Sequence, residues 1–382
     1  MNDLPEPDRI EGAPHPRETV RLIGQDAIEA RFLEAYDAGR LHHGWLITGP
    51  RGVGKATLAW RIARFLLAAS PAGAAGDGLF GDALPEAETL DVAPDHPVAR
   101  RILAGSEPGL HLLRRGGRGN TEAERAKAVQ EGNFSKEIRV DDVRELGRFL
   151  NLSAVDGGPR VVIVDSVDEM TTAAANALLK MLEEPPARTT LLLISHQPGR
   201  LLPTIRSRCR DLRLGPLSAP DMAEALAQAG FAPGPDAAAL AELSAGSVGE
   251  AIRLTTLDGL SLYAEIIAVL GALPRLDHAR ALKLADSLTG RGAEARLALF
   301  MHLSDIAMSR LARTGATGHA PPVEAAPRES ETLLRLAPSP AMGRAWASAA
   351  QEIGARMRHG TAVNLDPAAL VLDMMIRMKQ TA

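Results

Sequence analysis

The chain has 382 residues, of which 46% are hydrophobic and 24% charged, so it can bury more than one core. A formal net charge of −4 provides no overall attraction to DNA or to anionic membranes, which argues against an autonomous DNA-binding protein. Because Cys209 is the single cysteine, the chain can form neither an internal disulfide nor a cysteine-rich zinc site of its own.

The first 20 residues are rich in proline and charge and lack hydrophobic periodicity, which predicts a tail or an extended arm. They contain no basic-then-apolar signal pattern. No apolar run in the chain approaches the roughly 20 residues needed to cross a bilayer. We therefore expect a cytoplasmic protein without membrane contact.

Structure is expected to begin near residue 21. A helical pattern over residues 28–36 leads to a short buried strand, "GWLIT" (44–48), then to a glycine loop and the amphipathic helix "KATLAWRIARFLLAA" (55–69). This order of strand, loop and helix is the context that a phosphate-binding loop requires.

The glycine loop supplies the candidate nucleotide-binding residues. These are Gly49, Pro50, Arg51, Gly52, Val53, Gly54, Lys55, Ala56 and Thr57. The glycines let backbone N–H groups turn toward phosphate oxygens at a helix N-terminus, and Lys55 adds a positive charge at the β- and γ-phosphates. Ala56 stands where the pattern requires a magnesium-binding Ser or Thr, and Thr57 points about 100° away around the helix. We expect ATP or ADP binding to be possible, with magnesium-assisted hydrolysis impaired.

Residues 70–135 have mixed character. "PVARRILAG" (97–105) predicts a short helix, whereas "SPAGAAGDG" (70–78) predicts a loop. The arginine-rich segment from Arg114 to Gly132 is interspersed with acidic residues, which favours a solvated loop over a phosphate-contacting segment.

Strands and helices alternate again from residue 138. A helix over 140–150 is followed by the buried strand "VVIVD", the helix "TTAAANALLKMLEE" and the buried strand "TTLLLISH". This alternation predicts an α/β domain, with a parallel sheet wrapped by helices, over residues 21–215. Only helices are expected beyond it, short ones over 216–260 and longer ones over 261–382.

Two strand ends carry further candidate residues. Asp165 ends "VVIVD" in the manner of a Walker B aspartate, which holds magnesium through water, but the residue after it is Ser166 and not a water-orienting glutamate. Asp168 and Glu169 are better explained as favourable charges before a helix. Ser195 and His196 fit a γ-phosphate sensor or a strand-terminal turn equally well.

Three segments together resemble the clamp-loader ATPases of the AAA+ superfamily. They are "GRLHHGWLITGPRGVGK", "VVIVDSVDEMTTAAANALLKMLEEPP" and "LLPTIRSRC", and the likeness covers about residues 20–255. It implies an AAA+ nucleotide-binding domain (21–215) after an N-terminal tail (1–20), a small helical lid (216–260) and an all-α collar (261–382). The implied partners are the gamma/tau motor subunits and the delta subunit in a five-membered ring, with the sliding clamp and primer-template DNA contacted through the complex.

The resemblance also assigns a role to Arg208. In this family the arginine of the Ser-Arg-Cys motif reaches into the ATP site of the neighbouring subunit, so Arg208 is the candidate catalytic residue, acting in trans. Active subunits carry Thr, Glu and a lid Arg where this chain has Ala56, Ser166 and Gly249. Arg253 lies about one helical turn further on and is not expected to substitute. With one cysteine, the four-cysteine zinc module of many relatives cannot hold its metal, so no zinc is expected.

Two functions follow from these motifs. The three losses and the retained Arg208 favour a non-catalytic stator subunit without intrinsic ATPase activity. The intact glycines and Lys55 favour the alternative, an active AAA+ motor of the gamma/tau type or of the Holliday-junction branch-migration type.

Overall fold

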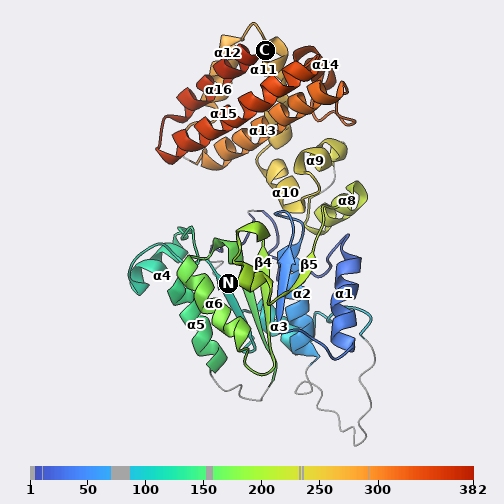
Figure 1. Cartoon of the computed structure of the whole chain (residues 1–382), viewed down its shortest axis with the longest axis vertical. Helices are drawn as coiled ribbons and strands as arrows, with labels where there is room; N and C mark the ends of the chain where they lie inside the picture. The colour runs from blue at the N-terminus through green and yellow to red at the C-terminus, as the bar shows by residue number, and fades with distance from the viewer. Residues whose placement is uncertain are drawn as a thin grey trace, which may run out of the picture. The chain divides into compact units, whose positions relative to one another are not determined.

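A computed structural model describes residues 5–10, 12–69, 87–151, 158–231, 234, 236–290 and 292–382. The loop predicted over residues 70–78 lies outside these ranges. The chain forms two compact units (Figure 1). Met1–Gly230 and Ser247–Gly249 form the first, and Phe231–Gly246 and Glu250–Ala382 form the second. Each unit is described on its own.

The first unit is built on a five-stranded parallel sheet with the order β2-β3-β4-β1-β5. The strands are β1 (Gly44–Thr48), β2 (Leu110–Arg114), β3 (Arg160–Asp165), β4 (Thr189–Ser195) and β5 (Arg210–Arg213). Every residue of β1 and β4 is buried, as expected for central strands covered on both faces. Since all strands run the same way, their carboxyl ends share one edge of the sheet.

Helices cover both faces of this sheet (Figure 1). The helices before β5 are α1 (Asp26–Asp37), α2 (Lys55–Ala68), α3 (Pro97–Leu103), α4 (Glu122–Gln130), α5 (Val140–Asn151), α6 (Thr172–Glu183) and the short α7 (Pro203–Arg206), and α8 (Ala219–Gln228) follows it. Leu146 of α5 and Leu178 of α6 share one hydrophobic cluster with alternate strand residues such as Val162 and Leu193. The other face packs on α2, which is buried along almost its whole length. The predicted fold class, a parallel sheet wrapped by helices, is confirmed.

The prediction of a loop from Arg114 to Gly132 is wrong. Leu110–Arg114 forms the edge strand β2, and Glu122–Gln130 forms α4. Ala128 is the one buried residue of α4, so the sequence of this helix has little hydrophobic periodicity from which it could be predicted. Its start is instead defined by a capping box, in which the Thr121 hydroxyl accepts from the Glu124 N–H and the Glu124 carboxylate accepts from the Thr121 N–H.

The N-terminal arm, Pro5–Val20 without Glu11, contains neither helix nor strand in its described residues, as an extended arm would. It is nevertheless packed against the first unit. The side chains of Glu6, Asp8 and His15 are 8%, 7% and 0% exposed. The sequence does not reveal this burial, because proline and charge are also typical of solvated tails.

The second unit is helical. It contains α9 (Ala237–Ser244), α10 (Val248–Thr256) apart from its first two residues, α11 (Gly259–Ala272), α12 (His278–Asp286), α13 (Glu294–Thr317), α14 (Glu329–Leu336), α15 (Pro340–Ala362) and α16 (Pro367–Thr381). The long helices α13 and α15 pack against each other (Figure 1). The division of this helical part into a lid over 216–260 and a collar over 261–382 stays a prediction.

A buried ion pair joins three helices of the second unit. Arg310 Nε on α13 lies 2.9 Å from Glu329 Oε1 on α14, and the Tyr263 hydroxyl on α11 donates to the same oxygen at 2.5 Å. Glu329 is fully buried, so these partners offset the cost of removing its charge from water. Arg310 also donates to the carbonyl of Val323, which ties the proline-rich segment before α14 to the helices.

Taken one at a time, none of the helices that the structure describes has both the length and the apolar content that crossing a membrane requires. Helices α10 and α11, bent by 79° at their break, reach that length and composition only together. Leu262, Ile266 and Leu270 make α11 apolar, and their side chains are buried inside the second unit.

Candidate functional site

The glycine loop lies between β1 and α2 at the carboxyl edge of the sheet, in the first unit. Gly49, Gly52 and Gly54 all have positive φ, at 143°, 73° and 99°. A Cβ on Gly49 would lie 2.5 Å from the Leu214 carbonyl oxygen, so the loop has no room for a side chain there. The loop therefore has the backbone form that presents N–H groups to a phosphate at the start of α2.

Lys55 is 3% exposed and points back into the loop. Its ammonium donates to the carbonyl oxygen of Gly49 at 2.7 Å and to that of Pro50. Burial lowers the pKa of Lys55 to about 8, against the opposing charges of Asp165 and Asp168. The ammonium of Lys55 is thus held inside the glycine loop.

The magnesium side of the site is incomplete. Ala56 has no hydroxyl, and Ser166, 3% exposed, replaces the carboxylate expected after Asp165. Burial raises the pKa of Asp165 to about 7, and the nearby charges of Asp8 and Glu169 act in the same direction. Among the residues described, no group of three or more His, Cys, Asp or Glu side chains is placed to hold a metal ion. Ala56 thus leaves the loop without the hydroxyl that a magnesium ligand at this position requires, and nucleotide binding stays a prediction.

Glu169 and Asp168 are held by specific partners in the short 3₁₀ helix Val167–Glu169. Glu169 bridges Arg51 of the glycine loop, at 2.8 Å, and Arg115 after β2, at 3.0 Å. Asp168 accepts a hydrogen bond from the His196 N–H at 3.0 Å. These carboxylates therefore join the glycine loop to the ends of neighbouring strands, a role that is more specific than the predicted charges before a helix.

Ser195 and His196 end β4 at the same edge. Within the described residues, the fully buried Ser195 hydroxyl and His196 Nδ1 have no hydrogen-bond partner. Burial lowers the pKa of His196 well below its usual range, and Lys55 and Arg51 lower it further, so the imidazole is neutral at pH 7. Whether these side chains sense a γ-phosphate stays a prediction.

Gly249, where active subunits carry the lid arginine, packs on the glycine loop itself. Its N–H donates to the carbonyl oxygen of Gly52 at 3.1 Å, and a Cβ on Gly249 would lie 3.0 Å from the Gly52 Cα. A side chain would have to displace this contact. Arg253 belongs to the second unit, where it forms a two-pronged ion pair with Glu250.

Arg208 lies at the opposite edge of the sheet. It follows α7 and precedes β5, whose first residue Arg210 is paired with Trp45 near the start of β1. The glycine loop follows the end of β1, so roughly 15 Å of strand separates the two sites. Arg208 Nη2 lies 2.9 Å from Glu183 Oε1 and Nη1 donates to the Thr204 carbonyl at 3.0 Å, with the side chain 37% exposed. The structure does not bring Arg208 to its own glycine loop.

Cys209, beside it, is a packing residue. Its sulfur would lie 3.3 Å from a Cβ on Gly44, and it packs on the hydrophobic cluster that contains Leu182. Burial raises the pKa of the thiol to about 12. The "SRC" motif therefore combines a half-exposed arginine with a cysteine that anchors the chain at the start of β1.

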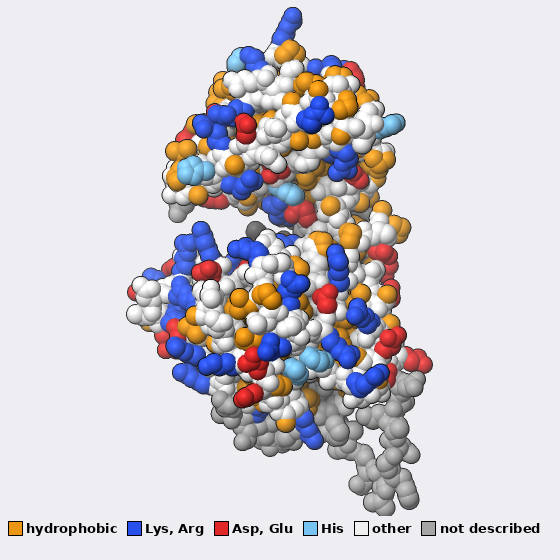
Figure 2. Space-filling model, viewed as in Figure 1, with side chains coloured by type: hydrophobic (Ala, Val, Ile, Leu, Met, Phe, Trp, Pro, Cys, Tyr) orange, Lys and Arg blue, Asp and Glu red, His pale blue; other side chains and the backbone are white. Residues whose placement is uncertain are grey.

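Several basic side chains of the predicted loop region have partners. Arg114 is paired with Asp8, Arg115 with Glu169 and Lys127 with Glu131. Exposed basic side chains of the first unit gather over α4 and α5 (Figure 2), where they include Lys127, Arg144 and Arg148. Acidic residues on the same helices, such as Asp141, offset part of this charge.

Comparison with known proteins identifies the family. The family model described as "DNA polymerase III, delta subunit" matches residues 24–218, which is half of the chain. The chain belongs to the DNA polymerase III delta-subunit family. The matched range contains the glycine loop, Asp165 and Arg208.

Curated relatives in this family include DNA polymerase III subunit delta′ of Pseudomonas aeruginosa, 36% identical over 234 residues that cover 61% of each chain. The delta′ subunit of Escherichia coli K12 is 35% identical over 187 residues, 49% of this chain and 46% of its own. The resemblance to clamp-loader subunits that the three segments predict is confirmed, with delta′ subunits among the relatives. The chain spans about half to three fifths of the length of these relatives.

Solved structures whose backbone was matched to this chain include that of a gamma-subunit-related protein of Thermotoga maritima. It is 16% identical, with a TM-score of 0.34, and the match covers 91% of this chain and 99% of that one.

Proposed function

We propose that this chain is a non-catalytic subunit of a DNA polymerase III clamp loader and that Arg208 completes the ATP site of a neighbouring subunit. The observation that carries the proposal is the placement of Arg208 at the amino edge of the sheet, a strand length away from the chain's own glycine loop. A half-exposed guanidinium held by one surface carboxylate is available to a partner's phosphates. Membership in the delta-subunit family supports the proposal that the chain is a clamp-loader subunit.

In this account the partners are gamma/tau-type motor subunits and a delta subunit in a pentameric ring. The sliding clamp and primer-template DNA are reached through that complex. The α/β domain presents Arg208 to the adjacent motor, and the helical region closes the ring. Arg208 stabilises the negative charge that develops on the neighbour's γ-phosphate during hydrolysis.

The chain's own site has a different role. Gly49, Gly52, Gly54 and Lys55 would hold the phosphates of ATP or ADP through loop N–H groups and one ammonium. With Ala56 and Ser166, the site lacks the hydroxyl that binds magnesium directly and the glutamate that orients the attacking water. A nucleotide bound here would be structural and would not turn over.

The second candidate, an active ATPase motor, is favoured by one observation, the intact glycine cradle around Lys55. Turnover separates the two functions. We expect no ATP hydrolysis by the purified chain above a Lys55→Ala control. We also expect hydrolysis by a complex reconstituted with motor and delta subunits on primed DNA and clamp. Robust turnover by the isolated chain that Lys55→Ala removes would establish the motor instead.

A further inference from the structure

The N-terminal arm crosses the carboxyl edge of the sheet on its way to α1. The carbonyl of Pro7 accepts from Arg115 Nη2, just beyond β2, at 3.2 Å. Ile10 lies against Gly249, at the contact of Gly249 with Gly52 of the glycine loop. The imidazole of His15 then meets the Trp60 ring of α2 edge-on, with 5.8 Å between ring centroids. The arm thus passes the ends of β2 and β3 and the glycine loop in turn.

Two carboxylates fix the arm in this place. Asp8 Oδ1 lies 2.6 Å from Arg114 Nη1, and Asp8 Oδ2 lies 3.2 Å from His15 Nε2. Glu6 receives two hydrogen bonds from Arg17, at 2.9 and 3.1 Å, and lies 3.1 Å from the same Arg114 nitrogen. Because both acids are more than nine-tenths buried, their charges depend on these partners.

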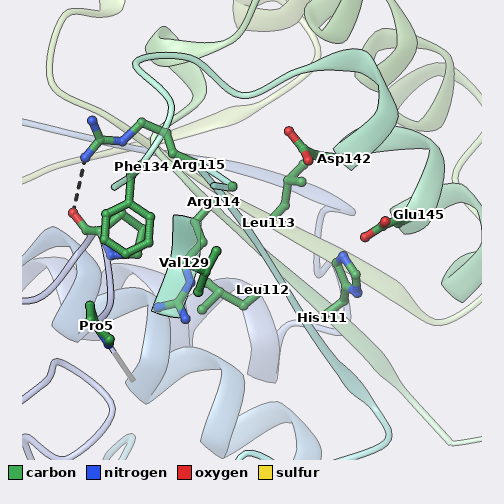
Figure 3. Close-up of a pocket in the computed structure, with 12 residues that line it drawn as sticks. Pro5, His111, Leu112, Leu113, Arg114, Arg115, Val129, Phe134, Asp142 and Glu145 are labelled. Atoms are coloured by element: carbon green, nitrogen blue, oxygen red, sulfur yellow. Dashed lines mark hydrogen bonds between the residues drawn. The ribbon is translucent and has the colours of Figure 1, made fainter. Parts of the chain in front are cut away.

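The start of the arm is held by polar contacts more than by apolar packing. A cavity of about 230 Å³ lies between Pro5 and Pro7 of the arm and the residues of β2, α4 and α5 (Figure 3). Arg115 donates to the arm at one side of this cavity, and Glu145 lies at the other side (Figure 3). Because ion pairs over an open space hold the start of the arm, this part can detach without exposing a packed core.

The arm's charges lie at the end of β2, beside the Asp165 end of β3. Arg114 is paired in register with Asp165, the carboxylate whose charge opposes the lowering of the Lys55 pKa by burial. Asp8 is close enough to Asp165 to help raise the pKa of that carboxyl, after the larger effect of burial. A triphosphate at Lys55 would bring several negative charges to this edge, where Glu6 and Asp8 already neutralise Arg114.

We propose that the N-terminal arm is an intramolecular occupant of the nucleotide site, with Glu6 and Asp8 in the place of ligand anionic charge, so that nucleotide binds at Lys55 only when the arm is released. The inference concerns regulation of the chain's own site, and it depends on the proposed phosphate-binding role of the glycine loop but not on Arg208 or on ring assembly.

The test compares the affinity of a fluorescent ATP analogue for four forms of the full chain. They are the wild type, Glu6→Gln/Asp8→Asn, and each of these with Lys55→Ala. Loss of the arm's charges removes the competitor, so we expect the double variant to bind at least about 10-fold more tightly than the wild type. Lys55→Ala should abolish that gain. Glu34→Gln/Asp95→Asn is the control, because it removes the same formal charge from exposed positions outside the arm.

A second measurement uses the wild-type chain alone, in case the double variant folds poorly. Competition is reciprocal, so saturating ATP should accelerate amide hydrogen exchange over residues 5–20. The proposal is overturned by equal affinity of wild type and double variant, by absence of binding in every form, or by tight binding that survives Lys55→Ala. Unchanged exchange in the arm at saturating ATP overturns it as well. None of these readouts involves a partner subunit, so their outcome is separate from that of the Arg208 role.

Discussion

The two edges of the parallel sheet differ in how their functional residues are held. At the carboxyl edge, Lys55 is buried against its own loop and the N-terminal arm lies over the neighbouring strand ends. At the amino edge, Arg208 is half exposed and is held by the surface carboxylate of Glu183 and by one carbonyl. One domain thus keeps the edge with the glycine loop covered and leaves the opposite edge accessible.

This difference accounts for the pattern of losses in the sequence. Ala56, Ser166 and Gly249 all belong to the covered edge, and in the proposed function they stand in place of a magnesium-binding hydroxyl, a water-orienting glutamate and the lid arginine. Arg208 belongs to the accessible edge, where a partner subunit would find it. In the proposed function, the chain hydrolyses no ATP at one edge and contributes to hydrolysis at the other, which is possible because the two edges are a strand length apart.

The largest expected effect concerns Cys209, the residue next to Arg208 at the accessible edge. The raised pKa of Cys209, about 12, leaves almost no thiolate at pH 8 in the folded chain. We expect its reaction with a thiol reagent to be roughly 10³-fold slower than in the urea-unfolded chain, where the thiol has its ordinary pKa near 8.5. The reaction is easily assigned because the chain has one cysteine. Rates within 10-fold of each other would mean that Cys209 does not anchor this edge.

The next effect tests the close packing of the covered edge. Gly52→Ala places a Cβ 2.3 Å from Ser247 Oγ and 2.9 Å from the Gly249 backbone, at a φ of +73°. Gly39→Ala is the matched control, since its φ is +62° but nothing lies within 4 Å of the added Cβ. Both variants lose stability because alanine is strained at a positive φ. Only Gly52→Ala also creates a steric clash, which should lower the free energy of unfolding by about 2 kcal/mol more, or roughly 30-fold in the unfolding equilibrium. Equal midpoints in urea unfolding would show that the covered edge is not closely packed.

The smallest effect concerns the carboxylate that holds Arg208. The Arg208 and Glu183 side chains are 37% and 44% exposed, and exposed ion pairs contribute at most about 1 kcal/mol. Glu183→Ala should therefore change the free energy of unfolding by less than about 1 kcal/mol, as measured in urea. A loss several times larger would mean that Arg208 is a structural residue and would weaken its role toward a partner.

Much of the α/β domain can be predicted from the sequence, because central parallel strands such as "VVIVD" are continuous apolar runs and the glycine loop has a strict spacing. Strand β2 and helix α4 escape prediction. The edge strand is short and half-polar, and α4 is defined by its capping box and not by a hydrophobic face.

The candidate site is predicted only in part. Local spacing locates Gly49 to Lys55 and Asp165, and the family motif locates Arg208. The arm's contribution cannot be predicted in this way, because Glu6 and Asp8 meet Arg114 more than 100 residues along the chain. Ion pairs of this kind depend on the tertiary fold, and proline-rich acidic sequence gives no pattern that would reveal them.

The most direct test of the central claim isolates Arg208 as the one trans-acting arginine in a reconstituted clamp loader. The motor subunits carry alanine in place of their own Ser-Arg-Cys arginine, and this chain is the wild type, Arg208→Ala, Arg208→Lys or the control Arg206→Ala, which removes an exposed arginine two residues earlier. We expect ATP turnover, stimulated by clamp and primed DNA, with the wild type and with Arg206→Ala. Arg208→Ala should lower it by about 10³-fold, and lysine should restore little of it, because it lacks the planar fork of donors. Turnover that is unchanged by Arg208→Ala would contradict the account.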